Sequence, residues 1–202
     1  MPDLISPTGT LLLWAAIGYL LGSIPFGLIL SRVMGLGNLR EIGSGNIGAT
    51  NVLRTGSKTA AALTLLLDGG KAAVAVLLAR VYAADDAVQL AALAAFIGHC
   101  YPVWLGFKGG KGVATFLGLW LAYAWPVGLA CCATWLVFAA LRKISSLAAI
   151  MAASFSTIYA FMLGAPHSLL MGAVLTLLVF WRHRENIARL RAGTEPKIGE
   201  KG

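Results

Sequence analysis

Residues 59–80 read TAAALTLLLDGGKAAVAVLLAR, an apolar run whose only charged residues are Asp68, Lys71 and Arg80. A helix of about 20 apolar residues crosses the hydrocarbon core of a membrane, so this run predicts a transmembrane helix. Charged side chains at membrane depth normally face a partner or a cavity. Asp68 and Lys71 stand three positions apart, which places them on one helix face. The spacing predicts an ion pair, which either supports the fold or shapes a polar pocket.

Six further apolar runs flank this one, at residues 10–30, 88–105, 112–125, 126–141, 146–163 and 167–182. The chain is 58% hydrophobic and only 12% charged, which is about half the charged share of a soluble domain. We therefore predict an all-α integral membrane protein, a bundle of about seven transmembrane helices that forms a single domain over residues 1–202.

Three of the runs, 112–125, 126–141 and 167–182, are shorter than the roughly 17 residues that a span normally needs. Short spans fit if their polar ends lie below the membrane surface and line a pocket that water reaches. Alternatively, one pair of runs is re-entrant, or fewer helices cross the membrane.

The basic residues favour one orientation in the membrane. With the N-terminus outside, seven spans place fourteen of the 16 Lys and Arg residues on the inner side. These are Arg32, Arg40, Arg54, Lys58, Lys108, Lys111, Arg142, Lys143, Arg182, Arg184, Arg189, Arg191, Lys197 and Lys201. Cytoplasmic loops carry such an excess, so the C-terminus is expected in the cytoplasm. The first run lacks the features of a cleaved signal peptide and is expected to remain as a span.

The formal charge of +8 does not indicate nucleic acid, because no nucleic-acid-binding motif accompanies it. The basic loops instead suit anionic membrane lipids or anionic substrates. The segment after His183 predicts a short basic amphipathic helix at the inner interface, with loose polar residues beyond Gly193. Neither a disulfide framework nor a metal-ligand cluster is predicted from the three cysteines and three histidines.

The first polar segment of interest is a glycine-rich loop, GSGNIGATN at residues 43–51. Its G-x-G-x-x-G pattern is not a dinucleotide fingerprint, because no βαβ unit surrounds it. Such a loop either directs backbone N–H groups at an anion or serves only as a flexible turn. The candidate substrate ligands here are Ser44, Asn46, Thr50, Asn51 and Arg54.

A second segment, GHCYPVWLGFKGGKGVAT at residues 98–115, is rich in glycine and lysine. It is not a P-loop, because the glycine spacing differs and Gly112 follows Lys111. Two lysines and the start of a helix nevertheless suit a phosphate, whereas the alternative is a basic hairpin held by lipid headgroups. The candidate ligands here are Lys108, Gly109, Gly110, Lys111, Gly112 and Thr115.

Further candidates are His99, Ser146, His183 and Asn186, all near the inner ends of predicted spans. A lone histidine is often structural, but His99 directly precedes the lysine-rich segment. A Cys–His pair with Cys100 is disfavoured, because adjacent helical residues point about 100° apart. No carboxylate is placed by the sequence to form a triad with either histidine. His167 is expected on the outer side, and Ser146 either caps a helix or binds substrate.

The chain resembles the acyl-phosphate:glycerol-3-phosphate acyltransferase family of bacterial inner membranes, the PlsY family. The matching segments are residues 22–27, the loop 43–51 with Arg54, Asp68 with Lys71, residues 98–99, 102–103, 107–115 and 146–147, and the tail residues 183–187 and 193–195. Gly70, Ala72 and Ala148 depart from the pattern that we expect of this family, and they affect packing more than the phosphate loops.

This resemblance implies a seven-helix fold with an outer N-terminus and an active site at the cytoplasmic face of the inner membrane. It implies transfer of a fatty acyl group from acyl phosphate to the 1-hydroxyl of glycerol 3-phosphate, the first acylation of phospholipid synthesis. The products are lysophosphatidate and phosphate. A soluble phosphate acyltransferase that supplies the donor is then an expected partner, and no cofactor is expected.

On this hypothesis Ser44, Asn46 and residues 108–112 hold the acyl phosphate, and Arg54, Lys111, His183 and Asn186 hold glycerol 3-phosphate. Ser44 or backbone N–H groups stabilise the oxyanion, and His99, His183 or a substrate phosphate accepts the proton. The predicted catalytic residues are Ser44, His99, Lys111 and His183. The alternative function is a small organic-phosphate transporter, although the sequence lacks the inverted repeats typical of such proteins.

Overall fold

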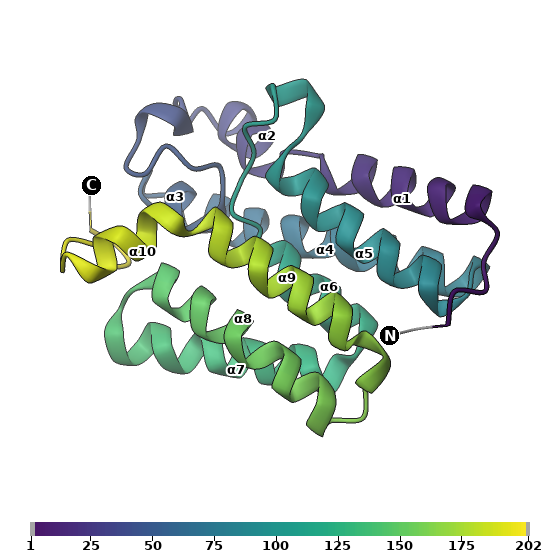
Figure 1. The fold of residues 1–202 in the computed structure, drawn as a ribbon. Coiled ribbons are helices and arrows are strands. Elements are labelled where there is room, and N and C mark those ends of the chain that lie inside the picture. The colour runs from purple at the N-terminus through teal and green to yellow at the C-terminus, as the bar shows by residue number, and fades with distance from the viewer. Residues whose placement is uncertain (1–2, 201–202) are drawn as a thin grey trace.

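The structure, a computed structural model, describes residues 3–200, and every regular element in that range is a helix (Figure 1). The expectations for Lys201, and for the outermost residues of the 1–202 domain, lie outside the described residues. The α-helices are α1 Thr8–Gly22, α2 Phe26–Val33, α3 Ala49–Leu53, α4 Lys58–Tyr82, α5 Asp85–Cys100, α6 Val113–Tyr123, α7 Trp125–Arg142, α8 Ser145–Met162, α9 Leu169–Arg182 and α10 Arg184–Arg191. Three short 3₁₀ helices connect them at Leu39–Glu41, Val103–Leu105 and Pro166–Ser168.

Five segments are long and apolar enough to cross a membrane: Thr8–Val33, Lys58–Tyr82, Asp85–Leu105, Trp125–Arg142 and Ser145–Met162. Two further apolar segments, Val113–Tyr123 and Pro166–Arg182, are shorter. The predicted runs 112–125 and 167–182 are therefore short helices, as expected. Helix α7 is longer than the predicted run 126–141, because it also includes Trp125 at one end and Arg142 at the other.

The first predicted span, 10–30, is interrupted in the middle. Helix α1 ends at Gly22, and α2 begins at Phe26 after Pro25. Proline disfavours helical backbone in the residue before it and has no N–H to donate, so the helix stops and starts again. The interruption leaves the carbonyl groups of Ser23 and Ile24 available to other elements: the first accepts from Trp104 Nε1 at 2.8 Å and the second from Lys71 at 2.7 Å.

Close contacts between small residues bring the helices together. A methyl group added at Gly22 of α1 would lie 2.0 Å from the backbone oxygen of Ala95 in α5, and one at Gly118 of α6 would lie 2.2 Å from that of Gly69 in α4. Small residues allow this approach of helix backbones, which is typical of helix packing in membranes. Helix α5 lies at the centre, with twelve of its 16 residues buried.

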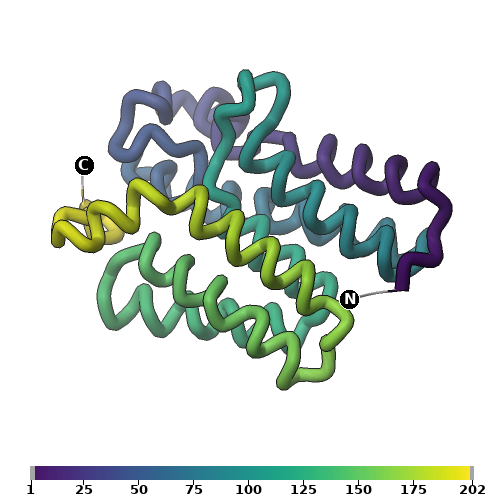
Figure 2. The backbone as a smooth tube through the Cα atoms, in the orientation of Figure 1, coloured from purple at the N-terminus to yellow at the C-terminus, as the bar shows by residue number. Residues whose placement is uncertain are grey.

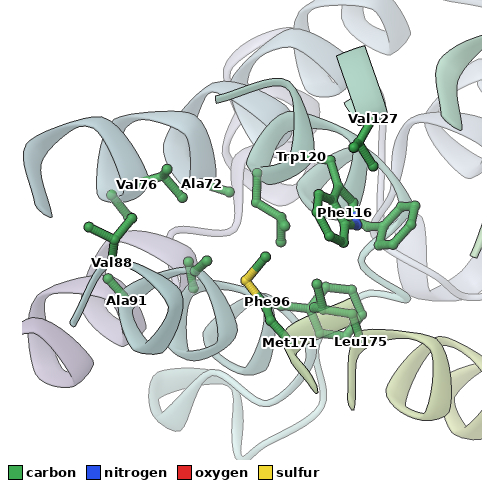
Figure 3. Packing of buried hydrophobic residues seen from close by; sticks show 14 of the residues in the cluster. Ala72, Val76, Val88, Ala91, Phe96, Phe116, Trp120, Val127, Met171 and Leu175 are labelled. Atoms are coloured by element: carbon green, nitrogen blue, oxygen red, sulfur yellow. The ribbon is translucent and has the colours of Figure 1, made fainter. Parts of the chain in front are cut away.

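Large side chains fill the space where α5, α6 and α9 meet. Phe96 of α5, Phe116 of α6, and Met171 and Leu175 of α9 lie against one another there (Figure 3). By contrast, many leucines of α4 and α7, such as Leu66 and Leu141, are exposed on the outside of the bundle. An apolar exterior around a core rich in alanine and glycine is what a lipid-facing bundle requires.

The loops that carry the predicted site residues gather at one end of the bundle. The backbone trace shows residues 34–57, the segment after α5, the α7–α8 turn and the C-terminal tail at the end where the chain finishes (Figure 2). The N-terminus lies at the opposite end. His167 lies at that opposite end as well, because its carbonyl accepts a hydrogen bond from Gln89 near the start of α5.

Candidate active site

A cavity of about 820 Å³ opens at the end of the bundle where the loops gather. Its polar walls come from the 43–54 segment, the start of α6, the α8 N-terminus, the α9–α10 junction and the tail. Its polar lining includes Arg40, Ser44, Asn46, Thr50, Asn51, Arg54, Asp68, His99, Lys111, Ser145, Ser146, Arg182, His183, Glu185, Asn186, Arg189, Glu195 and Lys197. The cavity therefore brings together residues from both predicted phosphate segments and the tail.

The other arm of the cavity is apolar and runs between α4, α6 and α7. It is lined by Ala61, Ala62, Leu65, Val113, Ala114, Leu117, Cys132, Trp135 and Leu136. A polar end joined to an apolar arm suits an amphiphilic ligand, with a charged group at the end and a hydrocarbon chain along the helices.

All but three of the predicted site residues line this cavity, the exceptions being Lys108, Gly110 and Thr115. The Lys108 carbonyl accepts a hydrogen bond from the Arg40 guanidinium, which joins the two phosphate segments. Gly110 lies against the His99 ring, and a methyl group there would come within 2.1 Å of Nε2. The Thr115 hydroxyl donates to the Asp68 backbone oxygen at 3.1 Å.

Asn51 organises the glycine-rich loop. Its Oδ1 accepts from the Ser44 backbone N–H at 3.1 Å and from Arg54 Nη1 at 3.2 Å. Its Nδ2 donates to the carbonyl oxygens of Leu39 and Asn46, at 2.9 and 2.7 Å. Both ends of this buried amide are used inside the protein, so Asn51 positions Ser44 and Arg54 at the cavity.

The glycine-lysine segment presents a helix start to the cavity rather than an open glycine loop. The N–H groups of Gly109 and Gly110 donate to the carbonyls of Cys100 and His99, at 3.0 and 3.1 Å. Among residues 3–200, the N–H groups of residues 111–115 donate to no protein acceptor. Gly112 begins the helix with φ of +80°, a conformation that glycine adopts without strain. Unpaired N–H groups at a helix start favour an anion.

Lys111 places its ammonium group beside Asn186, to whose Oδ1 it donates a hydrogen bond. Burial lowers the pKa of Lys111 to about 8, and the nearby Arg189 contributes in the same direction. Burial and the neighbouring cations both disfavour the charged form of Lys111, and an anion in the cavity would favour it.

His183 is a neutral histidine at the α9–α10 junction. Its Nδ1 lies 2.8 Å from the Val179 carbonyl oxygen, so Nδ1 carries the proton and Nε2 is left as an acceptor. Burial lowers its pKa to about 4, despite the opposing effect of that backbone hydrogen bond. At neutral pH the ring is therefore uncharged, and its Nε2 can accept a hydrogen bond.

A buried cluster lies at the floor of the cavity, within the helices. The Lys71 ammonium is 2.7 Å from Asp68 Oδ1 and 2.9 Å from His99 Nδ1, so the predicted ion pair is confirmed. It also donates to the carbonyl oxygen of Ile24 at 2.7 Å. The Asp68 carboxylate is 3.7 Å from His99 Nδ1. A carboxylate therefore does lie near this histidine, and the Lys71 ammonium contacts both groups.

The C-terminal tail is held in place, and the expectation of loose residues beyond Gly193 is wrong. Glu195 accepts from Ser146 Oγ and from Arg189 Nε, both at 2.7 Å, and from the Asn186 amide. Burial alone would raise the pKa of Glu195, but these three hydrogen bonds hold it below its usual value. The Ile198 N–H also donates to the Lys143 carbonyl, at 2.7 Å.

Several cavity residues were not predicted as site residues from the sequence: Arg40, Arg182, Arg189 and Glu195. Arg182 donates to the Gly110 carbonyl at 2.9 Å and lies over the Tyr101 ring, so it holds the second phosphate segment against α9. For Arg182 and Arg189 the only sequence signal is the concentration of basic residues from the end of α9 onward, which does not distinguish a cavity wall from an exposed helix. Within residues 3–200 no group of three His, Cys, Asp or Glu side chains is placed to hold a metal.

Residues 12–193 match the protein family described as glycerol-3-phosphate acyltransferase. A curated relative of that name from Ruegeria pomeroyi is 70% identical over 201 residues, covering 100% of this chain and 99% of the relative. Another, from Roseobacter denitrificans, is 64% identical over 191 residues and covers 95% and 96% of the two chains.

Two solved structures of PlsY (YgiH), an integral membrane glycerol 3-phosphate acyltransferase, have the same fold. The glycerol 3-phosphate form matches with a TM-score of 0.88 and 40% identity, over 95% of this chain and 96% of the other. The lysophosphatidic acid form matches with a TM-score of 0.85 and 38% identity, over 94% and 95%. With its sequence and its fold in agreement, this multi-pass membrane protein belongs to the glycerol-3-phosphate acyltransferase family, as a relative of PlsY.

Proposed function

We propose that this protein transfers a fatty acyl group from acyl phosphate to the 1-hydroxyl of glycerol 3-phosphate, releasing lysophosphatidate and phosphate. The observation that carries the proposal is a cavity in which a cationic polar end continues into an apolar arm. The donor has an acyl chain and a phosphate, and the acceptor has a second phosphate. Family membership and the glycerol 3-phosphate and lysophosphatidic acid forms of PlsY support the acceptor and the product.

Acyl phosphate is the donor that fits the chemistry of the site. Its phosphate is already a good leaving group, so the protein needs to position the reactants and stabilise charge rather than activate a thioester. The sequence lacks the H-x₄-D motif common in soluble glycerol 3-phosphate acyltransferases, because Trp104, Gly172 and Ala188 stand at the aspartate position after the three histidines. A soluble enzyme that makes acyl phosphate is the corresponding partner.

In the reaction, the acceptor hydroxyl oxygen bonds to the acyl carbon, the bond from that carbon to the phosphate oxygen breaks, and phosphate leaves. The hydroxyl proton passes to a substrate phosphate. Ser44 and the unpaired N–H groups at the start of α6 face the oxyanion and the donor phosphate. Arg54 and Lys111 hold the acceptor phosphate, with Arg54 suited to two-point contact. His183 Nε2 and Asn186 orient the glycerol hydroxyls.

The remaining predicted residues support this arrangement in different ways. Asn46, Thr50 and Ser146 are further ligands on the cavity wall, whereas Asn51 positions the loop. Gly109, Gly110 and Gly112 permit the close approach of the second segment to α5. Lys108 and Thr115 lie behind the wall and act through Arg40 and Asp68.

The protein crosses the bacterial inner membrane seven times as a single domain over residues 1–202, with the N-terminus outside and the C-terminus in the cytoplasm. The charge distribution supports this orientation. In this proposal the seven spans are the five longer apolar segments and the two shorter ones that contain α6 and α9. The polar end of the cavity then opens to the cytoplasm, where glycerol 3-phosphate is dissolved, and the apolar arm lies within the bilayer.

The test is an assay of the purified protein in lipid nanodiscs with palmitoyl phosphate and glycerol 3-phosphate. We expect phosphate release and lysophosphatidate formation that require both substrates, and no product when palmitoyl-CoA replaces palmitoyl phosphate. Arg54→Gln is expected to lose most activity, and His167→Gln, at the opposite end of the bundle, to retain it. Formation of lysophosphatidate from palmitoyl-CoA and glycerol 3-phosphate, without palmitoyl phosphate, would refute the donor assignment. Well-folded protein without any product would refute the enzyme assignment, and flux of glycerol 3-phosphate into vesicles would then test the transporter reading.

A further inference from the structure

A second cavity lies beside α2, and only Arg40 is shared between its lining and that of the reaction cavity. It is a groove of about 780 Å³ between α2, the 37–40 segment and the turn after α5. Within the described part of the chain, its only charged lining residues are Arg32 and Arg40. Its apolar walls are formed by Pro25, Leu28, Ile29, Val33, Leu39 and Leu105.

The groove lies at one end of a membrane-spanning segment. Ile29 belongs to the apolar segment Thr8–Val33, which is long enough to cross a membrane, and Arg40 lies beyond its end. Beside the groove wall, Trp104 is half exposed, and its Nε1 donates to the Ser23 carbonyl at 2.8 Å. Tryptophan with an exposed ring and a satisfied N–H is typical of the membrane–water interface. The apolar walls therefore lie beside acyl chains, and the arginines lie near the headgroups.

The uncharged polar side chains of the groove are already bonded within the protein. Ser31 Oγ donates to the Gly37 carbonyl at 2.9 Å, which holds the segment after α2 against that helix. The Asn38 side chain accepts from the Arg40 N–H at 3.0 Å and donates to Glu41 at 2.7 Å. The Glu41 carboxylate is engaged in this way and does not line the groove. The two arginines are therefore the polar groups left for a ligand.

Arg32 presents an exposed guanidinium to the groove. Among residues 3–200 no carboxylate forms an ion pair with it. The Arg40 guanidinium donates to the carbonyls of Gly45 and Lys108, and its further N–H groups remain for an anion. Guanidinium groups suit phosphate, and the apolar walls suit a hydrocarbon chain. The groove as a whole therefore fits an anionic amphiphile.

We infer that this groove binds one anionic phospholipid of the surrounding leaflet. The lipid phosphate contacts Arg32 and Arg40, and an acyl chain lies against α2 and Leu105. A zwitterionic lipid has the same phosphate, but its ammonium group would stand near two arginines that no lining carboxylate offsets. The inference does not rest on the proposed reaction, because neither the groove nor its place at the membrane depends on the substrates.

The experiment measures lipid binding by the purified full chain. The protein in neutral detergent is titrated with dioleoylphosphatidylglycerol or dioleoylphosphatidylcholine, and bound lipids are counted by native mass spectrometry. We expect one phosphatidylglycerol to bind more tightly than any further lipid, and more tightly than phosphatidylcholine. Equal affinity for the two lipids would overturn the inference.

Arg32 is the residue to change, because Arg40 also lines the reaction cavity. One arginine near a membrane surface corresponds to about fivefold in affinity for anionic lipid. We therefore expect Arg32→Gln to weaken the tight phosphatidylglycerol site by that factor, and Arg32→Lys, which keeps the charge, to recover most of the affinity. The Tm of each variant reports whether it remains folded.

The matched control is Arg191→Gln. Arg191 is also an exposed arginine at the end where the loops gather, but it lines neither the groove nor the reaction cavity. We expect this variant to bind phosphatidylglycerol as the unmodified protein does. Equal losses in Arg32→Gln and Arg191→Gln would indicate diffuse attraction to a basic surface and would overturn the site.

A competition distinguishes a lipid site from a site for free phosphate. Inorganic phosphate has the charge of the headgroup but no chain for the apolar walls, so we expect millimolar phosphate to leave the tight phosphatidylglycerol bound. Full displacement of the lipid by inorganic phosphate would overturn the lipid assignment. None of these outcomes depends on catalysis, so a protein that forms no product would refute the proposed function and leave this inference standing.

Discussion

At the scale of single residues, Lys111 is a cation whose charge depends on its place in the cavity. Its ammonium is removed from water and stands near Arg189 and Arg182, which together with burial bring its pKa to about 8. Glu195 and Glu185 oppose this shift only in part. An exposed lysine keeps its proton to about pH 10, so Lys111 loses its charge much earlier.

This shift predicts an alkaline limb in the activity. Below pH 8 Lys111 is charged, as its proposed role of binding the acceptor phosphate requires, and as the pH rises through 8 the charge is lost. Because kcat/KM reports ionisations of the free enzyme, we expect kcat/KM for glycerol 3-phosphate to fall by about tenfold per pH unit above that value. Lys111→Arg should remove the limb, and Lys58→Arg, outside the cavity, should leave it in place. A profile of the unmodified protein that stays level to pH 9 would contradict this assignment.

Glu195 provides the second prediction at this scale, and it concerns stability. Its folded pKa is lowered by Ser146, Asn186 and Arg189. The stabilisation is therefore fully present above the unfolded pKa, near 4.5, and is lost as the pH falls through the lower folded value. Glu195→Gln should reduce the free energy of unfolding by about 1–3 kcal/mol at neutral pH, and its Tm should depend less on pH below 4.5. The control is Glu185→Gln, because the Glu185 carboxylate makes no hydrogen bond among residues 3–200. An equal loss of Tm in both variants would argue against this role of Glu195.

At the scale of helices, the contact between α1 and α5 sets the stability of the bundle. Alanine at Gly22 would place a methyl group 2.0 Å from the Ala95 carbonyl oxygen, and backbone cannot move aside as a flexible side chain does. We expect Gly22→Ala to lower the Tm in detergent, with an overpacking cost of about 1–3 kcal/mol or more. Gly9 lies on the same helix with nothing within 4 Å of an added methyl group, so Gly9→Ala should leave the Tm unchanged. If both variants have the Tm of the unmodified protein, α1 and α5 are not packed as closely at Gly22 as the structure shows.

The helices themselves could be predicted from the sequence, because apolar runs bounded by polar loops reflect local chemistry. The interruption at Pro25 was missed, since the run 10–30 stays apolar across it. The Asp68–Lys71 pair was predicted because it needs only helix spacing. The contact of Lys71 with His99 was not, because it joins residues 28 positions apart through packing. Similarly, the link between Arg40 and the Lys108 carbonyl depends on how two loops fold together.

At the scale of the whole molecule, the orientation in the membrane is the prediction to check. Arg191 is exposed at the end where the loops gather, and His167 is exposed at the opposite end. In a Cys132→Ser background, with Cys100 and Cys131 buried, single cysteines are introduced as His167→Cys and Arg191→Cys. We expect a membrane-impermeant maleimide to label His167→Cys in intact cells and Arg191→Cys only after the membrane is opened. Labelling of both from outside would mean that α9, which lies between them, does not cross the membrane.

The shortness of α6 has a consequence for where the reaction meets the membrane. Helix α6 has 11 residues and α4 has 25, a difference of about 21 Å at 1.5 Å per residue. Thr115, in the first turn of α6, is level with Asp68, which lies ten residues and about 15 Å from the beginning of α4. If α4 begins at the membrane surface, as the proposed orientation has it, the start of α6 lies at the depth of the acyl chains. On the proposed function the acceptor then travels inward to the donor, and the acyl chain of the donor need not leave the bilayer to react.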